Sequence, residues 1–327
     1  MRERRQPKLL ICFDVAGWAQ HRHASGLAKY APPDLLVHAV DRGSYCQWSP
    51  GKLSTYTAVY IISLALAERR PGVRRLISCV ASHAWIYPRL NRSNWRTYGV
   101  NKRRCSGFGE KRLATLDAVT CRNGVLAGWA RGLCRRVAVF PAGVDREVFR
   151  PGEFRPVASP LRVGWCGQAG GITNFKGHDE IVAPLVDALP QYEWSVNRRN
   201  YENALSPGEM AEWYRSLDVF LCTSSADGTP NPPFEAAACG VPVISTDVGQ
   251  VSDWAAMRGS RFLVDSYSNE REAEVTRAQI VRRLAMLEDS TARWEHRERL
   301  LASIEEHYDY AKLAPRTLQW ILGKDDA

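Results

Sequence analysis

Short apolar segments alternate with longer amphipathic stretches along almost the whole chain. This alternation is typical of a parallel β-sheet covered by helices, because buried parallel strands are apolar on both faces and the crossovers between them need helices. The sequence therefore predicts an α/β protein. In the first half the expected strands are Leu9–Val15, Leu35–Val40, Ala58–Ile62, Leu76–Val80, Asp117–Cys121 and Val137–Phe140.

The alternation is more regular in the second half, which predicts a doubly wound unit of its own. Its expected strands are Leu161–Cys166, Tyr192–Val196, Asp218–Cys222 and Val241–Ser245. The helices expected between them are His178–Leu189, Pro207–Ser216 and Pro232–Cys239. From about Glu270 the pattern is helical to the end of the chain.

A chain of 327 residues is long enough for two domains of ordinary size. The segment from Pro151 to Pro160 contains prolines and a glycine that break any helix or strand, so we expect the interdomain linker there. The predicted domains are an N-terminal domain (1–155) and a second domain (156–309), followed by a C-terminal helix (310–327).

Charge separates the two halves of the chain. Residues 1–157 carry 27 Lys and Arg against 10 Asp and Glu, a net charge of +17, whereas residues 158–327 carry 17 against 25, a net charge of −8. A strongly basic half attracts polyanions such as nucleic acid or an anionic membrane surface. We therefore expect a polyanionic partner for the first half only.

The stretch from Pro88 to Arg112 has weak periodicity and is expected to be a long surface loop. Aromatic residues interleaved with basic ones suit a nucleic-acid strand or an extruded base. The opposing interpretation, a solvated loop with one packed tryptophan, is equally compatible with the pattern. The candidate polyanion-binding residues are Arg92, Trp95, Arg96, Lys102, Arg103 and Arg104.

The nine cysteines are scattered and form no C-x-x-C pair, which favours reduced thiols over a disulfide framework or a metal site. No run of about 18 apolar residues predicts a membrane span. We therefore expect a cytoplasmic protein without an integral membrane segment.

A loop rich in Gly and Pro connects the strand that ends at Cys222 to a short predicted helix. Thr229 or Asn231 can cap that helix, and Gly240 suits its left-handed end. A helix N-terminus at the carboxyl ends of parallel strands binds anions and nucleotides, so a diphosphate group is the expected ligand. Asp227 in the loop would lie on one side of this site.

Glu235, one turn into the helix, would lie on the other side. Carboxylates accept hydrogen bonds from vicinal hydroxyls, which ribose and hexose both present. The sequence therefore predicts a site for a sugar nucleotide, although either carboxylate taken alone would suit a turn or a solvated helix face.

The segment from Asp227 to Glu235 resembles the E-x7-E signature of the retaining GT4-type glycosyltransferases, which have the GT-B fold. Asp227 stands in place of the first Glu. Further segments that resemble the family are Phe140–Asp145, Phe149–Pro151, Val163–Gly164 and Lys176–Gly177. The resemblance covers residues 137–250 well and the first domain weakly. It implies two Rossmann-like, doubly wound domains facing each other across a cleft. In this arrangement residues 1–155 would form the acceptor-binding domain and residues 156–309 the nucleotide-sugar donor-binding domain, and the C-terminal helix (310–327) would cross back to the first domain.

The resemblance also implies roles for residues of the second domain. Glu235 would hold the ribose hydroxyls, Asp227 would contact hydroxyls of the transferred sugar, and Lys176 would neutralise the leaving phosphates. The loop residues expected to approach the diphosphate are Gly228, Thr229, Pro230 and Asn231.

In the family an arginine accompanies the lysine that Lys176 matches, but the loop that begins at Gln168 contains no arginine. Gln168 itself is a candidate donor-binding residue. Arg198 or Arg199 replaces the family's arginine, or backbone amides of the glycine-rich loop do so. In the first domain, His83 matches the histidine that faces the donor sugar. Gly17 follows the first strand, where a close backbone approach to the donor is expected.

The implied mechanism retains the anomeric configuration, with the leaving diphosphate taking the acceptor's proton and no protein nucleophile. No Asp-x-Asp pair suited to a divalent cation is found, so no metal is expected to be required. The expected co-substrate is a UDP-sugar, with glucose or another hexose as the sugar, and no tightly bound cofactor is expected.

Three acceptor hypotheses stay open. The first is a hydroxymethylated base in DNA, favoured by the basic first half and by the absence of a strongly amphipathic helix that could insert into a membrane. The second is a cell-envelope or lipid-linked glycan at an anionic membrane surface. The third is a non-catalytic nucleotide-sugar-binding protein, against which the presence of Lys176, Asp227 and Glu235 argues.

Overall fold

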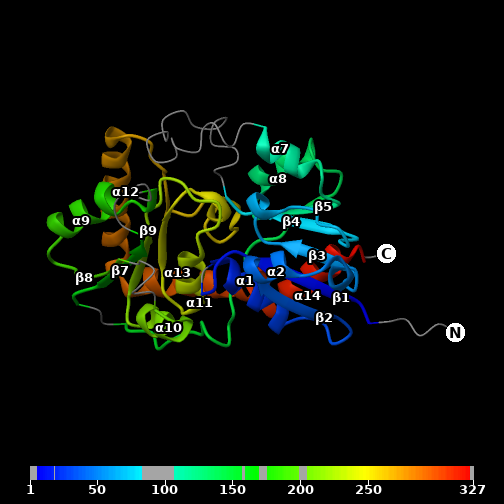
Figure 1. Ribbon diagram of the computed structural model, residues 1–327. Coiled ribbons are helices and arrows are strands. Elements are labelled where there is room, and N and C mark those ends of the chain that lie inside the picture. The colour runs from blue at the N-terminus through cyan, green and yellow to red at the C-terminus, as the bar shows by residue number, and fades with distance from the viewer. Residues whose placement is uncertain are drawn as a thin grey trace. The chain divides into compact units, whose positions relative to one another are not determined.

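The structure is a computed structural model that describes residues 6–17, 19–82, 107–156, 159–168, 175–198 and 205–324. The described chain divides into two compact units. The first unit contains the described residues up to Gly143 and the segment from Asp309 onward, and the second runs from Val144 to Tyr308. Each unit is built around its own parallel β-sheet (Figure 1).

The first unit contains a six-stranded sheet in the order β2-β1-β3-β4-β5-β6. Its strands are β1 (Lys8–Phe13), β2 (Leu36–Asp41), β3 (Ala58–Ile61), β4 (Leu76–Val80), β5 (Ala118–Cys121) and β6 (Val137–Val139). Its helices are α1 (Ala19–Lys29), α2 (Arg42–Gln47), α3 (Pro50–Leu53), η1 (Leu64–Leu66), α7 (Phe108–Leu113), α8 (Gly124–Arg131) and α14 (Tyr310–Leu322).

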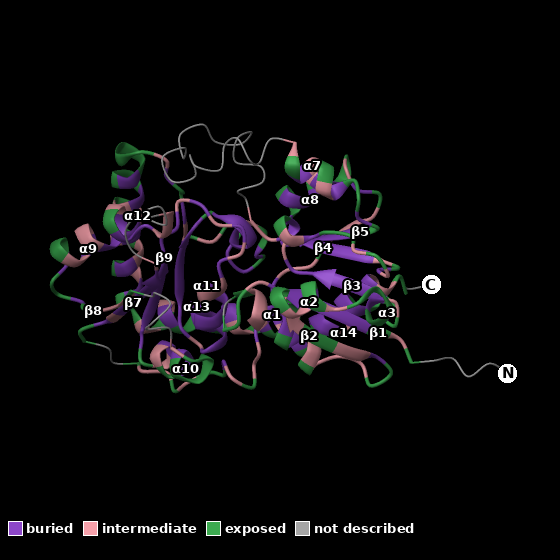
Figure 2. Ribbon diagram, viewed as in Figure 1, coloured by how far each residue is buried: buried purple, intermediate pink, exposed green. Residues whose placement is uncertain are grey.

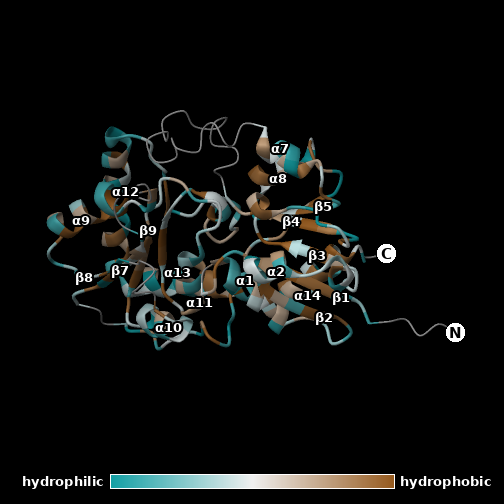
Figure 3. Ribbon diagram, viewed as in Figure 1, coloured by the Kyte–Doolittle hydropathy of each residue, from teal (hydrophilic) through white to brown (hydrophobic). Residues whose placement is uncertain are grey.

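Helices cover both faces of this first sheet, because its strands are apolar on both faces. On one face, Leu9 and Ile11 of β1 pack in a cluster with Leu27 of α1 and Leu318 of α14. On the other face, alternate strand residues pack against α2, α3, α7 and α8. Strands β1, β3, β4 and β5 are accordingly buried and apolar, the edge strands β2 and β6 are partly exposed, and polar residues lie on the outer helix surfaces (Figures 2 and 3).

The second unit contains a five-stranded sheet in the order β11-β10-β9-β7-β8. Its strands are β7 (Arg162–Gly167), β8 (Glu193–Arg198), β9 (Val219–Cys222), β10 (Val243–Thr246) and β11 (Leu263–Val264). Its helices are η5 (His178–Val182), α9 (Ala183–Ala188), α10 (Pro207–Arg215), α11 (Asn231–Ala238), η6 (Gly249–Asp253), α12 (Glu270–Glu288), α13 (Ser290–Ser303) and η7 (Ile304–Tyr308).

Both sheets follow the same doubly wound path. In each, the chain runs from its first strand to one neighbour, then returns past the first strand and continues in the opposite direction. The path reverses between β1 and β3 in the first sheet and between β7 and β9 in the second. In open parallel sheets, ligands bind at the carboxyl ends of the strands beside this reversal. The predicted pair of doubly wound α/β units is confirmed.

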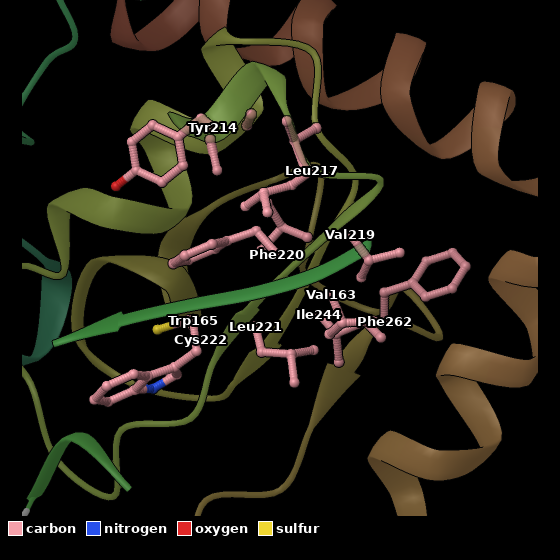
Figure 4. Packing of buried hydrophobic residues seen from close by; sticks show 14 of the residues in the cluster. Val163, Trp165, Tyr214, Leu217, Val219, Phe220, Leu221, Cys222, Ile244 and Phe262 are labelled. Atoms are coloured by element: carbon pink, nitrogen blue, oxygen red, sulfur yellow. The ribbon is translucent and has the colours of Figure 1, made fainter. Parts of the chain in front are cut away.

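A glycine gives the second sheet room for one of its core side chains. A Cβ on Gly164 of β7 would lie 2.1 Å from Leu217 Cδ1. Gly164 pairs with Phe220 in β9, and Leu217 and Phe220 pack with Tyr214 on that face of the sheet, whereas Trp165 and Leu221 lie on the other (Figure 4). The absence of a side chain at position 164 therefore lets Leu217 pack directly on the sheet.

The compact units divide earlier in the chain than the linker predicted at Pro151–Pro160. Val144 and Phe149 belong to the hydrophobic core of the second unit. The backbone N–H of Gly152 also donates to the carbonyl of Cys239 over 3.0 Å. These contacts place residues 144–155 with the second unit.

The last helix, α14, belongs to the first unit. Asp309 caps its N-terminus by accepting a hydrogen bond from the backbone N–H of Ala311 over 2.9 Å. Tyr310 lies against Gly26 of α1, where an added Cβ would meet the tyrosine ring at 2.6 Å. The helix therefore packs closely on α1.

Each strand expected from the sequence is present, but two helical details differ. The helix expected at His178–Leu189 begins with one π-helical turn, η5, before α9. Within the loop expected at Pro88–Arg112, the described residues include the start of α7, because Gly107 turns the chain at φ 81° and Leu113 is buried in the core.

In the part of the chain that the structure describes, no helix has the length and apolar character that a membrane span requires.

Candidate functional site

The candidate site lies where the path of the second sheet reverses, at the carboxyl ends of β7 and β9. Lys176 comes from the segment after β7, and Asp227 comes from the loop after β9. Two hydrogen bonds tie these segments together: Ser225 N–H donates to the Phe175 carbonyl over 2.8 Å, and the Thr223 hydroxyl donates to the Lys176 carbonyl over 2.8 Å. The geometry brings two distant segments to one sheet edge.

Lys176 and Asp227 form a short ion pair between Nζ and Oδ2. Burial lowers the pKa of the Lys176 ammonium, but the opposite charge of Asp227 and its hydrogen bond outweigh burial, and the pKa is raised above its usual value. The other carboxylate oxygen of Asp227 accepts from Thr229 N–H over 3.1 Å. Lys176 is therefore held as a cation beside the loop that leads into α11.

Trp165 and Gly177 shape the floor of this site. The Trp165 indole N–H donates to the Thr223 hydroxyl oxygen over 2.9 Å. Gly177 has φ 77°, and a Cβ there would lie 2.1 Å from the Thr223 carbonyl oxygen. Only glycine allows the chain after Lys176 to pass this close to β9.

A second glycine holds the other side of the loop. Gly249 has φ 55°, and a Cβ there would lie 2.4 Å from the Asp227 carbonyl oxygen. Next to it, Gln250 N–H donates to the Gly228 carbonyl over 3.2 Å. The Asp227–Gly228 turn is therefore fixed by the segment after β10.

Glu235 lies one turn into α11 and is 5% exposed. Its Oε2 accepts a hydrogen bond from the Tyr214 hydroxyl of α10 over 3.1 Å. A buried carboxylate with a positioned donor can accept further hydrogen bonds from a ligand through its remaining lone pairs.

The start of α11 differs from the expectation that Thr229 or Asn231 caps it. Pro230 occupies the cap position without a side-chain hydrogen bond, and Asn231 is the first helical residue. Asp227 rather than a cap side chain binds the Thr229 N–H. Gly240 ends the helix with φ 77°, as predicted.

A small pocket opens directly before α11. It is lined by residues of β7 and β9 and of the two loops that follow them, namely Trp165, Cys166, Lys176, Phe220, Leu221, Cys222, Thr223, Ser224, Pro230 and Pro232. The positive end of the α11 dipole and the Lys176 ammonium both favour an anion there.

Arg198 stands at the carboxyl end of β8, opposite Gly167 of β7. Its Nε–H donates to Nε2 of the buried His178 over 3.0 Å. Nε2 is therefore the acceptor, so the proton lies on Nδ1, which donates to Asp179 Oδ1 over 2.6 Å. Arg198 is thus positioned at the same sheet edge as Lys176.

Two other residues that the sequence predicted for the donor site lie directly after strands. Gln168 directly follows β7 and is half-buried. Gly17, after β1 of the first unit, has φ 81°, and its N–H donates to His21 Nδ1 over 2.9 Å. The predicted residues that lie outside the described residues are His83, Arg92, Trp95, Arg96, Lys102, Arg103, Arg104 and Arg199, and their roles stay predictions.

The site also contains residues that sequence reasoning missed. Trp165, His178 and Tyr214 each support a predicted residue or its loop through one hydrogen bond. In the sequence, Trp165 and Tyr214 are apolar positions of a strand and a helix, and His178 is one residue of a predicted helix. Only the pairing of β7 with β8 and β9 brings them beside their partners.

Solved structures define the class of this fold. Sucrose-phosphate synthase from Thermosynechococcus elongatus matches with a TM-score of 0.65 and 13% identity, over 97% of this chain and 98% of that one. HepE from Anabaena, solved in complex with UDP-glucose, matches with a TM-score of 0.63 and 12% identity, over 97% of this chain and 100% of that one. At these identities the likeness concerns the fold alone, which is the GT-B fold.

The family match falls on the second unit. Residues 192–279 match the family model for Glycosyl transferases group 1, and this range contains both Asp227 and Glu235. This part of the chain is therefore similar to the glycosyltransferase group 1 family. A relative named lipopolysaccharide core biosynthesis mannosyltransferase LpsB, from Rhizobium meliloti (strain 1021), is 26% identical over 186 residues. The match covers 47% of this chain, and the chain spans 52% of that relative's length.

Proposed function

We propose that this protein is a retaining glycosyltransferase of the GT4 type that takes a hexose from a UDP-sugar. The observation that carries the proposal is the Lys176–Asp227 ion pair at the reversal point of the second sheet, directly before the helix that carries Glu235. This arrangement lies in the unit whose residues match the glycosyltransferase family.

Lys176 binds the diphosphate in this proposal. Its ammonium has three N–H donors, and Asp227 occupies one of them, so two can bind phosphate oxygens. Pro230, Pro232 and Pro233 have no N–H, which leaves few backbone donors at the start of α11. The charge of Lys176 and the helix dipole therefore supply most of the attraction, with Arg198 or Arg199 as a second cation.

The two carboxylates bind hydroxyl groups in this proposal. Glu235 accepts hydrogen bonds from the ribose hydroxyls while Tyr214 fixes its orientation. Asp227 contacts the transferred sugar through its carboxylate, of which Lys176 holds one oxygen and Thr229 N–H the other. Positioned groups of this kind cost little reorganisation when the transition state forms.

The reaction breaks the bond between the anomeric carbon and the diphosphate oxygen. The acceptor oxygen forms its new bond to the anomeric carbon on the same face, and its proton passes to the departing diphosphate. Lys176 stabilises the negative charge that develops on the leaving group. No metal is required in this scheme, so transfer should persist in the presence of EDTA.

For the acceptor, the net charge of +17 on residues 1–157 supports a hydroxymethylated base in DNA. The name of the relative LpsB, a lipopolysaccharide core mannosyltransferase, supports a cell-envelope glycan as the second candidate. The two candidates differ in what carries the acceptor hydroxyl, so product analysis separates them.

The test is to incubate the protein with a panel of nucleotide sugars and, in separate reactions, with DNA that contains hydroxymethylcytosine, with DNA that lacks it, and with lipid and glycan acceptors. After digestion to nucleosides, mass spectrometry detects an added hexose. A hexosyl nucleoside only with hydroxymethylated DNA supports the first candidate. Sugar transfer only to lipid or glycan acceptors supports the second, and no transfer to any acceptor contradicts the enzymatic proposal.

Lys176→Ala should abolish transfer while the protein stays folded. Loss of one charge-stabilising group at the reacting centre typically lowers kcat by about 10²- to 10³-fold. Lys312→Ala, an exposed lysine in α14, is the matched control and should leave transfer unchanged. Full activity in the Lys176 variant would refute its role.

A further inference from the structure

A second basic site lies in the first unit, away from the carboxyl edge of its sheet. An open pocket of about 580 Å³ is lined by Arg74, Arg75, Asp117, Arg135 and Arg136. All five residues stand immediately before strands: the first pair precedes β4, Asp117 precedes β5, and the last pair precedes β6.

The strand order explains why these residues meet. β4, β5 and β6 are neighbours in a parallel sheet, so their amino ends lie at one edge. Three chain segments that are separated in sequence therefore bring four guanidinium groups to one place. This edge is opposite the one at which open parallel sheets bind their substrates.

The single carboxylate in the pocket is already neutralised. Asp117 Oδ2 accepts from Arg69 Nη2 and from the Leu76 N–H, both over 2.6 Å. Arg69 thus contributes a further positive charge that balances Asp117. The four lining arginines are left without a carboxylate among the pocket residues.

Two of these arginines contact the last helix of the first unit. Arg136 Nη2 donates to the Trp320 carbonyl over 2.9 Å, and its guanidinium lies 4.5 Å from the Trp320 ring centroid. Arg75 Nη1 approaches the Leu322 carbonyl at 3.5 Å. Both cations therefore stabilise the carboxyl end of α14, where the helix dipole is negative.

The other two, Arg74 and Arg135, are exposed. Neither guanidinium forms a hydrogen bond or an ion pair with any residue in the described part of the chain. No contact of the fold accounts for their positions, although gathering like charges is unfavourable unless an anion balances them.

We propose that Arg74 and Arg135, supported by Arg75 and Arg136, form a binding site for a phosphate group that carries at least two negative charges. The planar guanidinium fork matches two phosphate oxygens at once, which a lysine cannot do. The pocket is concave and bounded by the sheet edge, so it suits a compact phosphomonoester or diphosphate. The source of this group is either a soluble phosphorylated molecule or a phospholipid headgroup.

The test uses phenylglyoxal, which modifies exposed guanidinium groups, on the wild-type chain with peptide mapping by mass spectrometry. Inorganic diphosphate should slow the modification of Arg74 and Arg135 several-fold relative to chloride at equal ionic strength. Arg42 and Arg131, which are exposed on the same unit, are the internal controls. This local readout does not depend on donor binding in the second unit, so it can fail while the proposed function stands.

Vesicles of phosphatidylcholine with and without phosphatidic acid distinguish the two sources. Protection by diphosphate but not by the phosphatidic acid vesicles assigns a soluble ligand. Protection by both assigns a phosphate group that a lipid can supply. Equal protection of the control arginines, or no protection, would overturn the proposal. Protection by duplex DNA without protection by diphosphate would also overturn it, because an extended polyanion surface would then be the better assignment.

Variants give a second readout. Arg74→Ala combined with Arg135→Ala should weaken diphosphate binding at this site by roughly tenfold or more, since each removes a charge-assisted contact. Arg42→Ala combined with Arg131→Ala removes the same charge and should leave the site intact. Because both altered residues are exposed, thermal unfolding should be unchanged in either double variant.

Discussion

At the residue scale, His296 is a buried imidazole whose contacts fix it in the neutral form. It is 2% exposed and lies stacked on Phe262 with ring centroids 4.0 Å apart. Arg299 donates to Nδ1 over 2.9 Å, so Nε2 carries the proton and donates to the Val243 carbonyl over 2.8 Å. Burial chiefly, with the charge of Arg299, lowers the pKa of His296 to about 4.

This shift predicts a pH-dependent loss of stability. As the pH falls from 6.5 towards 4, the unfolded imidazole binds a proton and the folded one does not, so the unfolded state gains stability. Across that window the wild type should lose up to about 3 kcal/mol more unfolding free energy than His296→Gln. Urea denaturation at a series of pH values measures the difference, and it should not grow further below about pH 4.

His307→Gln is the control for this experiment, because His307 is half exposed. Its pH dependence should follow that of the wild type. Parallel stability curves for the wild type and His296→Gln would show that the buried histidine does not produce the effect.

At the element scale, the loop after β9 depends on glycines in neighbouring segments. Gly249→Ala would place a methyl group 2.4 Å from the Asp227 carbonyl oxygen, which must then move. Displacing the Asp227–Gly228 turn should weaken binding of a UDP-sugar by roughly tenfold or more, equivalent to about 1.4 kcal/mol. Isothermal titration calorimetry with UDP-glucose measures the change.

Gly259→Ala separates this effect from backbone strain. Gly259 also has a positive φ, 71°, but an added Cβ there has no neighbour within 4 Å. This variant should show only the loss of stability that alanine causes at a positive φ, together with normal donor affinity. If both variants bind UDP-glucose equally, the contact with the loop has no functional role.

The packing of α10 on the second sheet gives a further prediction. Gly164→Ala should destabilise the protein by about 1–3 kcal/mol, because the new methyl group would overlap Leu217. In the double variant with Leu217→Ala, the clash is removed. Chemical denaturation should therefore show a total loss smaller than the sum of the two single losses, and strict additivity would contradict the contact.

The sequence predicted the strands well because buried parallel strands need continuous apolar runs between turns. It predicted less about helix starts. At α11 the cap position is held by Pro230, and the π-helical turn of η5 has no local signature. Contacts such as the one between Tyr214 and Glu235 depend on the sheet order, which no short motif contains.

At the scale of the whole molecule, two units were predictable from length and periodicity, and their boundary was less so. The proline-rich segment at Pro151–Pro160 looks like a linker, but Val144 and Phe149 before it complete the core of the second unit. The family resemblance drew attention to Lys176 and Asp227, whereas their direct pairing became evident only in the structure.

In the proposed function, the second unit binds a nucleotide sugar through Glu235 and the Lys176–Asp227 pair beside it. Calorimetric titration of UDP-glucose and other nucleotide sugars into the wild type, Glu235→Gln and Glu274→Gln tests this binding. Glutamine keeps an oxygen for the Tyr214 hydroxyl, so the fold should persist, and Glu274 is an exposed glutamate of α12 that serves as the control.

We expect the wild type and Glu274→Gln to bind a nucleotide sugar with equal affinity. Glu235→Gln should bind about 10- to 100-fold more weakly, because a charged hydrogen-bond acceptor for the ribose is lost. Unchanged affinity in Glu235→Gln, or no binding of any nucleotide sugar by the wild type, would contradict the proposal.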